Sequence, residues 1–252
     1  MFDINNFVID RVVRGVALSQ KDDSVLFSIN QMQNVSLNCT SESTDAVDAL
    51  GTPIATFYRA KTAEFSAENA LFDMNLMATQ LGTTKEVASA TNKVLVPAME
   101  SFTVEGKQYE LKHTPKVAPA EIYVLNSDST FGVKYSKAKE TTAASNEFTI
   151  VGQTITLPTD VKVGDEMFVM YEYETENAVE VVNSATNFPV GCKFVMEVLG
   201  CDVCDQTNLI YAYVIFNNFK LSPDFDWSVA TDGTHPFSGK AQQDLIYRSL
   251  VA

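Results

Sequence analysis

Most of the chain alternates apolar and polar residues over short runs, which is typical of β-strands with one face in water. Residues 8–18 and 24–30 are rich in β-branched and aromatic side chains, and a polar KDD turn separates them. In the next run, Val35, Leu37 and Cys39 alternate with polar residues. These patterns predict an opening hairpin and a following strand of a sheet that has one wet face.

The run from Leu209 to Leu221 differs from the others because neither of its alternating faces is polar. One face carries Ile210, Ala212, Val214 and Phe216, and the other carries Tyr211, Tyr213 and Ile215. A strand that is apolar on both faces needs cover on both. We expect that cover to be either a helix of the same chain or another copy of the chain.

One segment, residues 68–81, has the periodicity of an amphipathic helix. Gly82 suits the left-handed residue that follows many helices, and Ser66 or Asn69 could cap the helix start. The residues that share the apolar face are Leu71, Met74, Met77, Ala78 and Leu81. Because the rest of the chain is predicted as strands, we expect this helix to pack against a sheet.

Between the predicted strands, residues 41–53 are rich in Ser, Thr, Asp and Gly. This composition predicts a loop, which would be long for a hairpin in a compact domain. Loops of this length usually have a function or are mobile.

The middle of the chain, residues 94–176, is predicted to contain a separate series of short strands. Prolines and glycines interrupt it about every ten residues, which is typical of a sandwich or barrel. Two arrangements remain open: an inserted β module, which we favour, or a continuation of the main sheets. With the insertion, residues 1–93 and 177–252 form one domain and residues 94–176 form an Ig-like or similar module.

The formal net charge of −14 and the pI near 4.5 argue against sequence-independent binding of nucleic acid. Such binding needs clustered Lys and Arg to neutralise phosphates. Acidic residues gather between positions 165 and 180, where the structure could have either a solvated strand edge or an anion-repelling surface. These residues are Asp165, Glu166, Glu172, Glu174, Glu176 and Glu180.

Candidate chemistry is sparse. The N-terminus lacks the basic and apolar regions of a signal peptide, and no apolar run approaches the length of a membrane span, so we expect synthesis in the cytoplasm and four cysteine thiols. Cys201 and Cys204 form a CxxC without a second ligand pair, and we expect no metal or cofactor. His113 and His235 are each followed shortly by a proline, as in loops, and no nucleophile or phosphate-binding motif occurs. We therefore expect no enzymatic activity.

Two stretches, residues 34–82 and 188–250, nevertheless resemble the major tail tube proteins of tailed bacteriophages. The first contains TDAVDALGTPIATFYRAKTAEFSAENALFDMNLMATQLG, and the second contains NFPVGCKFVMEVLG and LIYAYVIFNNFKLSPDFDWSVATDG. The resemblance implies a mainly β fold of two packed antiparallel sheets, sandwich-like or barrel-like, with one flanking α-helix. The middle segment departs from the short tube proteins and would be the inserted β module of larger members.

The resemblance also implies a function. Such proteins form hexameric rings that stack into the hollow tail tube, a virion structure assembled in the host cytoplasm, through which DNA passes without specific binding. Their partners are further copies, a tape measure protein, a terminator and, in contractile tails, a sheath. Residues 41–53 would reach the neighbouring ring, the helix at 68–81 would flank the sheets, and residues 233–252 would contact another subunit.

Three sets of site residues follow. The ring-stacking loop would use Ser41, Glu42, Asp45, Asp48 and Gly51. The subunit interface would use Tyr211, Tyr213, Ile215, Leu245, Ile246 and Tyr247. The acids that face the lumen and repel passing phosphates would be Glu172, Glu174 and Glu176.

Two other functions fit the composition. A head-decoration or tail-terminator protein would share the acidity and the β content. A module that binds carbohydrate or a cell surface would use Tyr and Phe side chains of the middle segment, although ordinary strand packing explains them as well.

Overall fold

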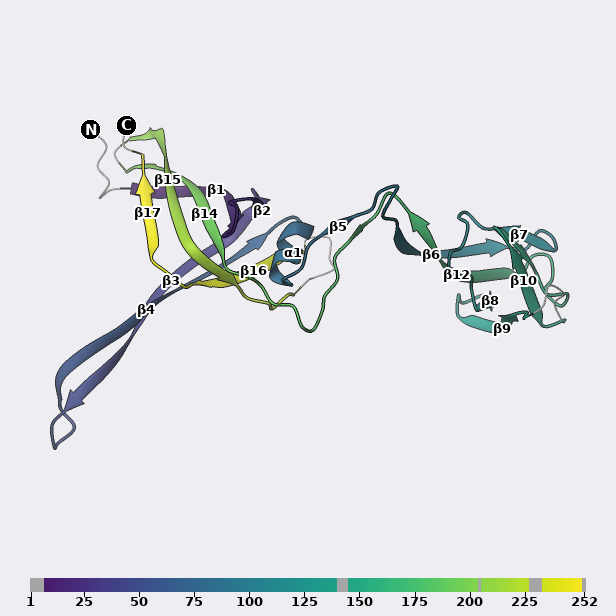
Figure 1. Ribbon diagram of the computed structural model, residues 1–252, viewed down its shortest axis with the longest axis horizontal. Coiled ribbons are helices and arrows are strands. Elements are labelled where there is room, and N and C mark those ends of the chain that lie inside the picture. Colours follow the sequence, from purple (N-terminus) through teal and green to yellow (C-terminus); the bar gives the residue numbers. More distant parts are fainter. Residues whose placement is uncertain (1–6, 140–144, 204, 227–232, 251–252) are drawn as a thin grey trace. The chain divides into compact units, whose positions relative to one another are not determined.

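The computed structural model describes residues 7–139, 145–203, 205–226 and 233–250. The chain divides into two compact units (Figure 1). The first unit comprises residues 1–85 and 181–252, and the second unit comprises residues 86–180. The inserted module predicted from the sequence has the bounds 94–176, which lie inside this second unit.

The first unit is built on one antiparallel sheet, in the order β2-β1-β14-β15-β16-β4-β3, with β17 paired to β15. The mainly β fold with one helix is therefore confirmed, although these strands are linked in a single sheet rather than two. Its strands are β1 (Phe7–Ser19), β2 (Val25–Ile29), β3 (Met32–Val47), β4 (Pro53–Asn69), β14 (Cys192–Asp202), β15 (Asp205–Leu221), β16 (His235–Ala241) and β17 (Leu245–Ser249).

This sheet curls around a core of phenylalanine side chains. The ring of Phe65 on β4 lies 5.4 Å from that of Phe194 on β14 and 5.7 Å from that of Phe237 on β16. Phe27 on β2, near the other end of the sheet, lies 6.4 Å from Phe237. Because strands from both ends of the sheet order supply this core, the sheet must close partly on itself. Edge-to-face and tilted ring pairs of this kind add to the free energy gained from burial alone.

The helix is much shorter than residues 68–81. The structure has α1 at Met74–Gln80, and the side chain of Asp73 caps it by accepting hydrogen bonds from the backbone N–H groups of Asn75 and Leu76. The predicted caps Ser66 and Asn69 are wrong because β4 continues to Asn69 by pairing with β16. Pairing with β3 and β16 therefore keeps residues 68–69 extended, where the first helical turn was predicted.

The buried face of α1 agrees with the prediction only at Ala78 and at Leu81, which directly follows the helix. Leu76, Ala78 and Gln80 are buried, whereas Leu71 lies before the helix and is 60% exposed. Gly82 has a φ of +67°, which confirms it as the left-handed residue after the helix. A Cβ at this position would collide with the backbone of Phe188.

Residues 41–53 are mostly not a loop. β3 runs to Val47 and β4 begins at Pro53, so only residues 48–52 form the turn of a long hairpin. The polar composition hid these strands because the hairpin has no buried face to produce an apolar alternation. In Figure 1 the hairpin runs past the other strands of the first unit.

The second unit has a seven-stranded sheet in the order β6-β12-β8-β9-β10-β11-β7. Its core contains Phe148, Ile122, Met167 and Val169, all without solvent exposure. A separate pair, β5 (Glu86–Val87) with β13 (Val179–Glu180), joins the two chain ends of this unit. The sheet strands are β6 (Val94–Thr103), β7 (Gln108–Glu110), β8 (Glu121–Leu125), β9 (Phe131–Lys137), β10 (Glu147–Val151), β11 (Thr154–Thr156) and β12 (Glu166–Thr175).

A buried carboxylate joins the two outer strands of this sheet. Glu100 on β6 is 3% exposed and accepts hydrogen bonds from the Tyr109 hydroxyl on β7 at 2.9 Å, the Tyr171 hydroxyl at 2.5 Å and the Lys112 backbone N–H at 3.1 Å. Phe102 on β6 stacks on Tyr109 at 3.5 Å. The first and last strands of the sheet order are thus brought together by side chains, although they share no backbone ladder.

The C-terminal residues 233–250 belong to the chain's own sheet. β16 lies between β15 and β4, and β17 continues along the same edge of β15. His235 begins β16 and is 1% exposed, so its prediction as a loop residue is wrong. Trp227 and Cys204 lie outside the described residues.

Candidate functional site

The outer part of the β3–β4 hairpin is a long, continuous exposed segment. Every residue from Asn38 to Thr62 is exposed. β4 pairs with β16 only from Ala63 onward, so the residues before it pair with β3 alone. An isolated two-stranded hairpin is at best marginally stable in water. The hairpin is therefore a candidate surface for assembly with another chain.

The turn of this hairpin is ordered by a side chain. Asp48 Oδ1 accepts hydrogen bonds from the backbone N–H groups of Leu50 and Thr52, both at 2.8 Å. These bonds lower the pKa of the Asp48 carboxyl. Gly51 supplies the positive φ of +84° that the turn requires. Asp48 is thus a turn former, as expected for a carboxylate between short strands.

The predicted stacking residues all lie on this hairpin. Ser41, Glu42 and Asp45 are on β3, and Asp48 and Gly51 are in the turn. Asp45 accepts a hydrogen bond from the Thr56 hydroxyl at 2.7 Å, across the ladder. The prediction overlooked the exposed apolar residues of β4. These are Ile54, Phe57 and Tyr58, with exposed fractions of 71%, 62% and 74%.

The predicted subunit interface is divided between two faces of the sheet. In the pairing of β15 with β17, Ile215 lies opposite Ile246, and Phe216 lies opposite Leu245. Phe216 faces the core, so Ile215 and Ile246 face away from it. The structure therefore brings Tyr211, Tyr213, Ile215 and Ile246 onto one outer face. It places Leu245 and Tyr247 on the core side, where Leu245 packs against the core.

One ion pair lies on the outer face beside these residues. Arg14 on β1 donates to Glu197 on β14 at 2.6 Å, and the Tyr213 hydroxyl donates to the same carboxylate at 3.2 Å. The hydrogen bond and charge of Glu197 raise the pKa of the Arg14 guanidinium. The three side chains form a polar row on a face that is otherwise half apolar, a composition common in the rims of protein interfaces.

The predicted lumen acids lie at the end of β12 or just beyond it, in the second unit. Glu174 is 3.0 Å from Lys116, and Glu176 is 3.1 Å from Lys93. Glu172 has no ion-pair partner among the described residues. The lysines reduce the local negative charge that this set would present to a phosphate.

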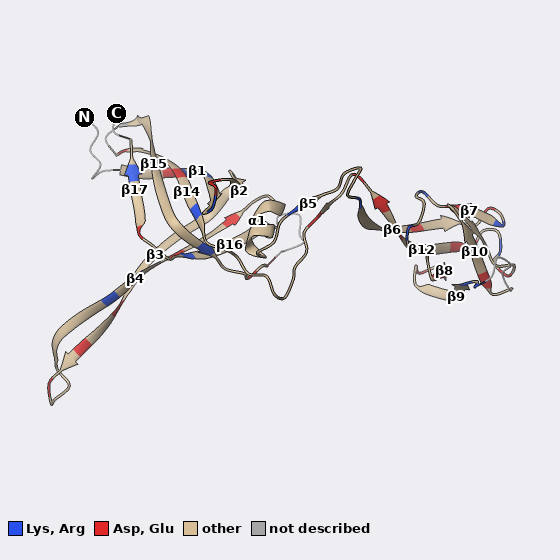
Figure 2. Ribbon diagram, in the orientation of Figure 1, with Lys and Arg blue, Asp and Glu red and all other residues tan. Residues whose placement is uncertain are grey.

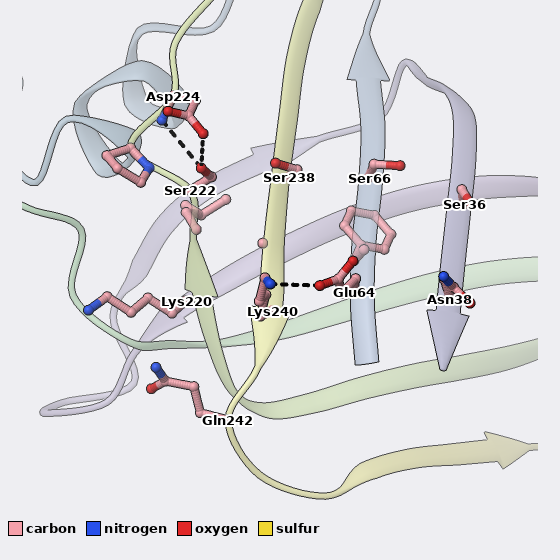
Figure 3. Close-up of a pocket in the computed structure, with 14 residues that line it drawn as sticks. Ser36, Asn38, Glu64, Ser66, Lys220, Ser222, Asp224, Ser238, Lys240 and Gln242 are labelled. Carbon is pink, nitrogen blue, oxygen red and sulfur yellow. Dashed lines mark hydrogen bonds and ion pairs between the residues drawn. The ribbon is translucent and has the colours of Figure 1, made fainter. Parts of the chain in front are cut away.

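A polar groove of about 660 Å³ lies over β3, β4, β16 and the end of β15 (Figure 3). The strand register places Ser36, Ser66 and Ser238 in one row across it. The next row contains Asn38, Glu64 and Lys240, with Lys240 2.6 Å from Glu64. Sequence reasoning overlooked this groove, because rows across a sheet appear only when the register is known.

No described group in or near the groove resembles a catalytic pair. Ser222 donates to Asp224 at 2.6 Å, and these two residues close one end of the groove as a local turn. His235 instead donates from Nε2 to Gln80 Oε1 at 2.8 Å and stacks on Phe72. Burial lowers the pKa of the His235 imidazole. In that position the imidazole links α1 to β16.

Cysteines and possible metal ligands add no further site. Cys39, Cys192 and Cys201 are free thiols, and burial raises the pKa of the Cys192 thiol to about 11. Among the described residues, no three or more His, Cys, Asp or Glu side chains are grouped to hold a metal ion. In the described part of the chain, no helix has the length and apolar character needed to cross a membrane.

The family model described as the YomU/Tube protein family matches residues 7–244. This range covers nearly the whole chain, including both units. No curated protein matches the chain.

Proposed function

Because the chain belongs to the YomU/Tube protein family, we propose that it is the structural subunit of a phage tail tube. Six copies form a ring, and rings stack into a hollow tube through which DNA passes. The family match supports the tube role. The observation that supports stacking is the hairpin, whose 25 residues from Asn38 to Thr62 are all exposed.

The first unit supplies the contacts within and between rings. The outer face with Tyr211, Tyr213, Ile215 and Ile246 is the proposed contact between subunits of one ring. Residues such as Tyr are common in the centres of interfaces because they combine large apolar area with a hydroxyl. Tyr247 is 62% exposed but lies on the opposite side of β17, so it is not part of this proposed contact.

The negative net charge of the chain supports a tube that does not bind the DNA passing through it. Residues 86–180 contain 15 of the 32 acidic and 8 of the 18 basic residues, so each unit has a net charge of −7. Acidic and basic residues are mixed along both units (Figure 2). A ring of such subunits repels phosphates without binding them. Glu172, Glu174 and Glu176 stay candidates for the bore, with Lys93 and Lys116 limiting their effect.

The other proposed partners are further proteins of the phage tail. A tape measure protein would lie in the bore, a terminator would cap the last ring, and a sheath would surround the tube in a contractile tail. The assembled product would be part of the virion, built in the host cytoplasm. The chain has no proposed enzymatic role.

Electron microscopy of the purified full-length protein tests this function. Hollow tubes or six-fold rings support it, and a protein that remains a monomer at high concentration contradicts it. A matched variant replaces residues 41–61 with Asn-Gly, a two-residue turn that joins the paired Thr40 and Thr62. We expect this variant to fold and to stop at single rings or monomers. Tubes from this variant would refute the stacking role of the hairpin.

A second function rests on exposed aromatic residues of the second unit. Phe131 is 59% exposed and lies 5.0 Å from the Tyr123 ring and 5.1 Å from the Phe168 ring. Aromatic surfaces of this kind can stack on sugar rings, which would make the unit a carbohydrate-binding module. Glycan binding by the full-length protein that is lost in Phe131→Ser would support this function, and no binding on a broad glycan array would exclude it.

A further inference from the structure

Strand β12 of the second unit is apolar on both of its faces. Met167 and Val169 point into the core of the unit and have no solvent exposure. Phe168 and Met170 alternate with them and therefore point to the outer face of the sheet. Positions that face only water are usually polar in an antiparallel sheet. The outer face of β12 is thus apolar without a layer of the same unit to account for it.

The residues around Phe168 and Met170 form one continuous apolar patch. Met170 lies directly opposite Met99 of β6, and the two side chains are 46% and 64% exposed. Phe168 lies opposite Tyr123 of β8, and its ring is 5.1 Å from that of Phe131 on β9. These five side chains, which we call the outer patch, extend over four neighbouring strands. Exposed apolar patches of this kind mark interaction sites, and methionine is common there because its flexible side chain adapts to a partner.

Two carboxylates lie at the ends of the outer patch. Glu166 and Glu172 share the outer face of β12 with Phe168 and Met170, which lie between them. Neither glutamate forms an ion pair with another described residue, whereas the nearby Lys134 is already paired with Glu121 at 2.8 Å. Glu172 follows Glu166 by six residues, which corresponds to about 20 Å along an extended strand. The patch is therefore apolar in its centre and negative at both ends.

We propose that the outer patch binds an amphipathic α-helix of another protein, with basic residues at both ends of the apolar stripe of that helix. In layered domains an apolar sheet face is covered by a second layer, often of helices, and the second unit has no helix among its described residues. A helix rises 1.5 Å per residue, so about 13 residues match the separation of Glu166 and Glu172. Lys or Arg at the two ends of the helix would then face these two carboxylates.

A second copy of this chain fits the patch poorly. Helix α1, the only helix in the described residues, has seven residues, and its side chains Leu76 and Ala78 are buried in the first unit. A copy also has a net charge of −14, which opposes its approach to the two glutamates. The same charges disfavour nucleic acid and anionic membrane surfaces. A sugar would stack on the aromatic rings and leave the methionines uncovered. The charge and shape of the patch therefore favour a basic segment of a different protein.

Two synthetic peptides test the patch on the full-length protein. Each peptide has about 18 residues, enough to span both glutamates as a helix, and carries leucine on one helical face. The opposite face carries lysine in one peptide and glutamate in the other. Isothermal titration calorimetry measures the dissociation constants. We expect the lysine peptide to bind and the glutamate peptide not to bind.

Substitutions in the apolar centre separate binding at the patch from general attraction to an acidic protein. The variant with Met99→Ser and Met170→Ser removes apolar area at two exposed positions, so it keeps the fold. The control is Val151→Ser, at a residue that is 78% exposed elsewhere in the second unit. We expect the double variant to raise the dissociation constant of the lysine peptide at least about tenfold, which corresponds to about 1.4 kcal/mol, and the control to match the wild type.

A second pair of variants tests the charges. Glu166→Gln with Glu172→Gln should also weaken binding at least about tenfold. The matched control is Glu110→Gln with Glu180→Gln, which changes the net charge equally at exposed positions outside the patch. Equal binding by the patch variants and the wild type, equal losses in the controls, or no binding of the lysine peptide to the wild type would overturn the proposal.

Photocrosslinking from position 170 identifies the natural partner. Benzoylphenylalanine at this exposed position should label, in assembled virions, a different protein at a segment with an apolar stripe and basic ends. The label should be lost when Glu166 and Glu172 are both replaced by Gln. Labelling of this chain alone, within one molecule or between copies, would overturn the proposal. The peptide measurements do not depend on tube formation, so a protein that forms no tubes would refute the proposed function and leave this inference to be decided by binding.

Discussion

The buried Glu100 carboxylate should stabilise the second unit. Substitution of Glu100 can measure this contribution to the free energy of unfolding. Glu100→Ala removes the acceptor of the Tyr109 hydroxyl, the Tyr171 hydroxyl and the Lys112 backbone N–H. Tyr171 is 2% exposed, so its hydroxyl cannot turn to water without opening the core. A buried polar group left unpaired costs about 1–3 kcal/mol. With two such hydroxyls and the lost side-chain packing, we expect about 3–5 kcal/mol of destabilisation.

Glu100→Gln is the matched control, because it keeps the shape and can hydrogen-bond the same groups. It loses only the extra strength of bonds to a charged acceptor, for which we expect about 1–2 kcal/mol. Native-state hydrogen exchange measures both variants at the amides of β6 and β12. The amides of β14 in the first unit serve as the internal reference, because the two units have separate cores. If Ala and Gln were equally tolerated, or if β14 lost as much protection as β12, the reasoning would fail.

Three further predictions concern single residues of the first unit. Burial lowers the folded-state pKa of His235, so stability should fall as the pH drops below about 6.5, and His235→Gln should remove this dependence in urea titrations. Gly82→Ala should lower the free energy of unfolding by more than about 1 kcal/mol, seen by calorimetry, because of the positive φ and the Phe188 backbone. A maleimide reagent should label exposed Cys39 quickly and buried Cys192 only on unfolding. Equal labelling rates would contradict the burial of Cys192.

The strands were predictable where one face is buried. The β-branched and aromatic content of residues 8–18 predicted β1, and the run from Leu209 to Leu221 predicted most of β15. The helix start was not predictable, because the segment 68–81 has helical periodicity, whereas residues 68–69 are held in β4 by pairing with β3 and with distant β16. The local sequence cannot show such long-range strand pairing, and tertiary contacts override a weak helix propensity.

The candidate site was predicted in part for similar reasons. Alternation correctly separated Tyr211, Tyr213 and Ile215 from the core-facing side of β15. Residues 245–247 were grouped because they are adjacent, yet adjacent residues of a strand face opposite ways. The outer end of β3, residues 41–47, was missed because these residues have no apolar face. This part of β3 became visible only in the structure, where its pairing with β4 is seen.

The charge of the subunit limits what can hold a tube together. In the proposed assembly every neighbour is a copy with a net charge of −14, so attraction between whole subunits cannot be electrostatic. The attraction must come from short-range contacts that bury apolar area, and the exposed apolar residues of the hairpin and of the outer face of β15 supply them. Repulsion acts over the screening length of about 8–10 Å, whereas burial acts only at contact. In the proposed tube the exposed Ile54, Phe57 and Tyr58 of the hairpin supply apolar area where like-charged rings approach each other.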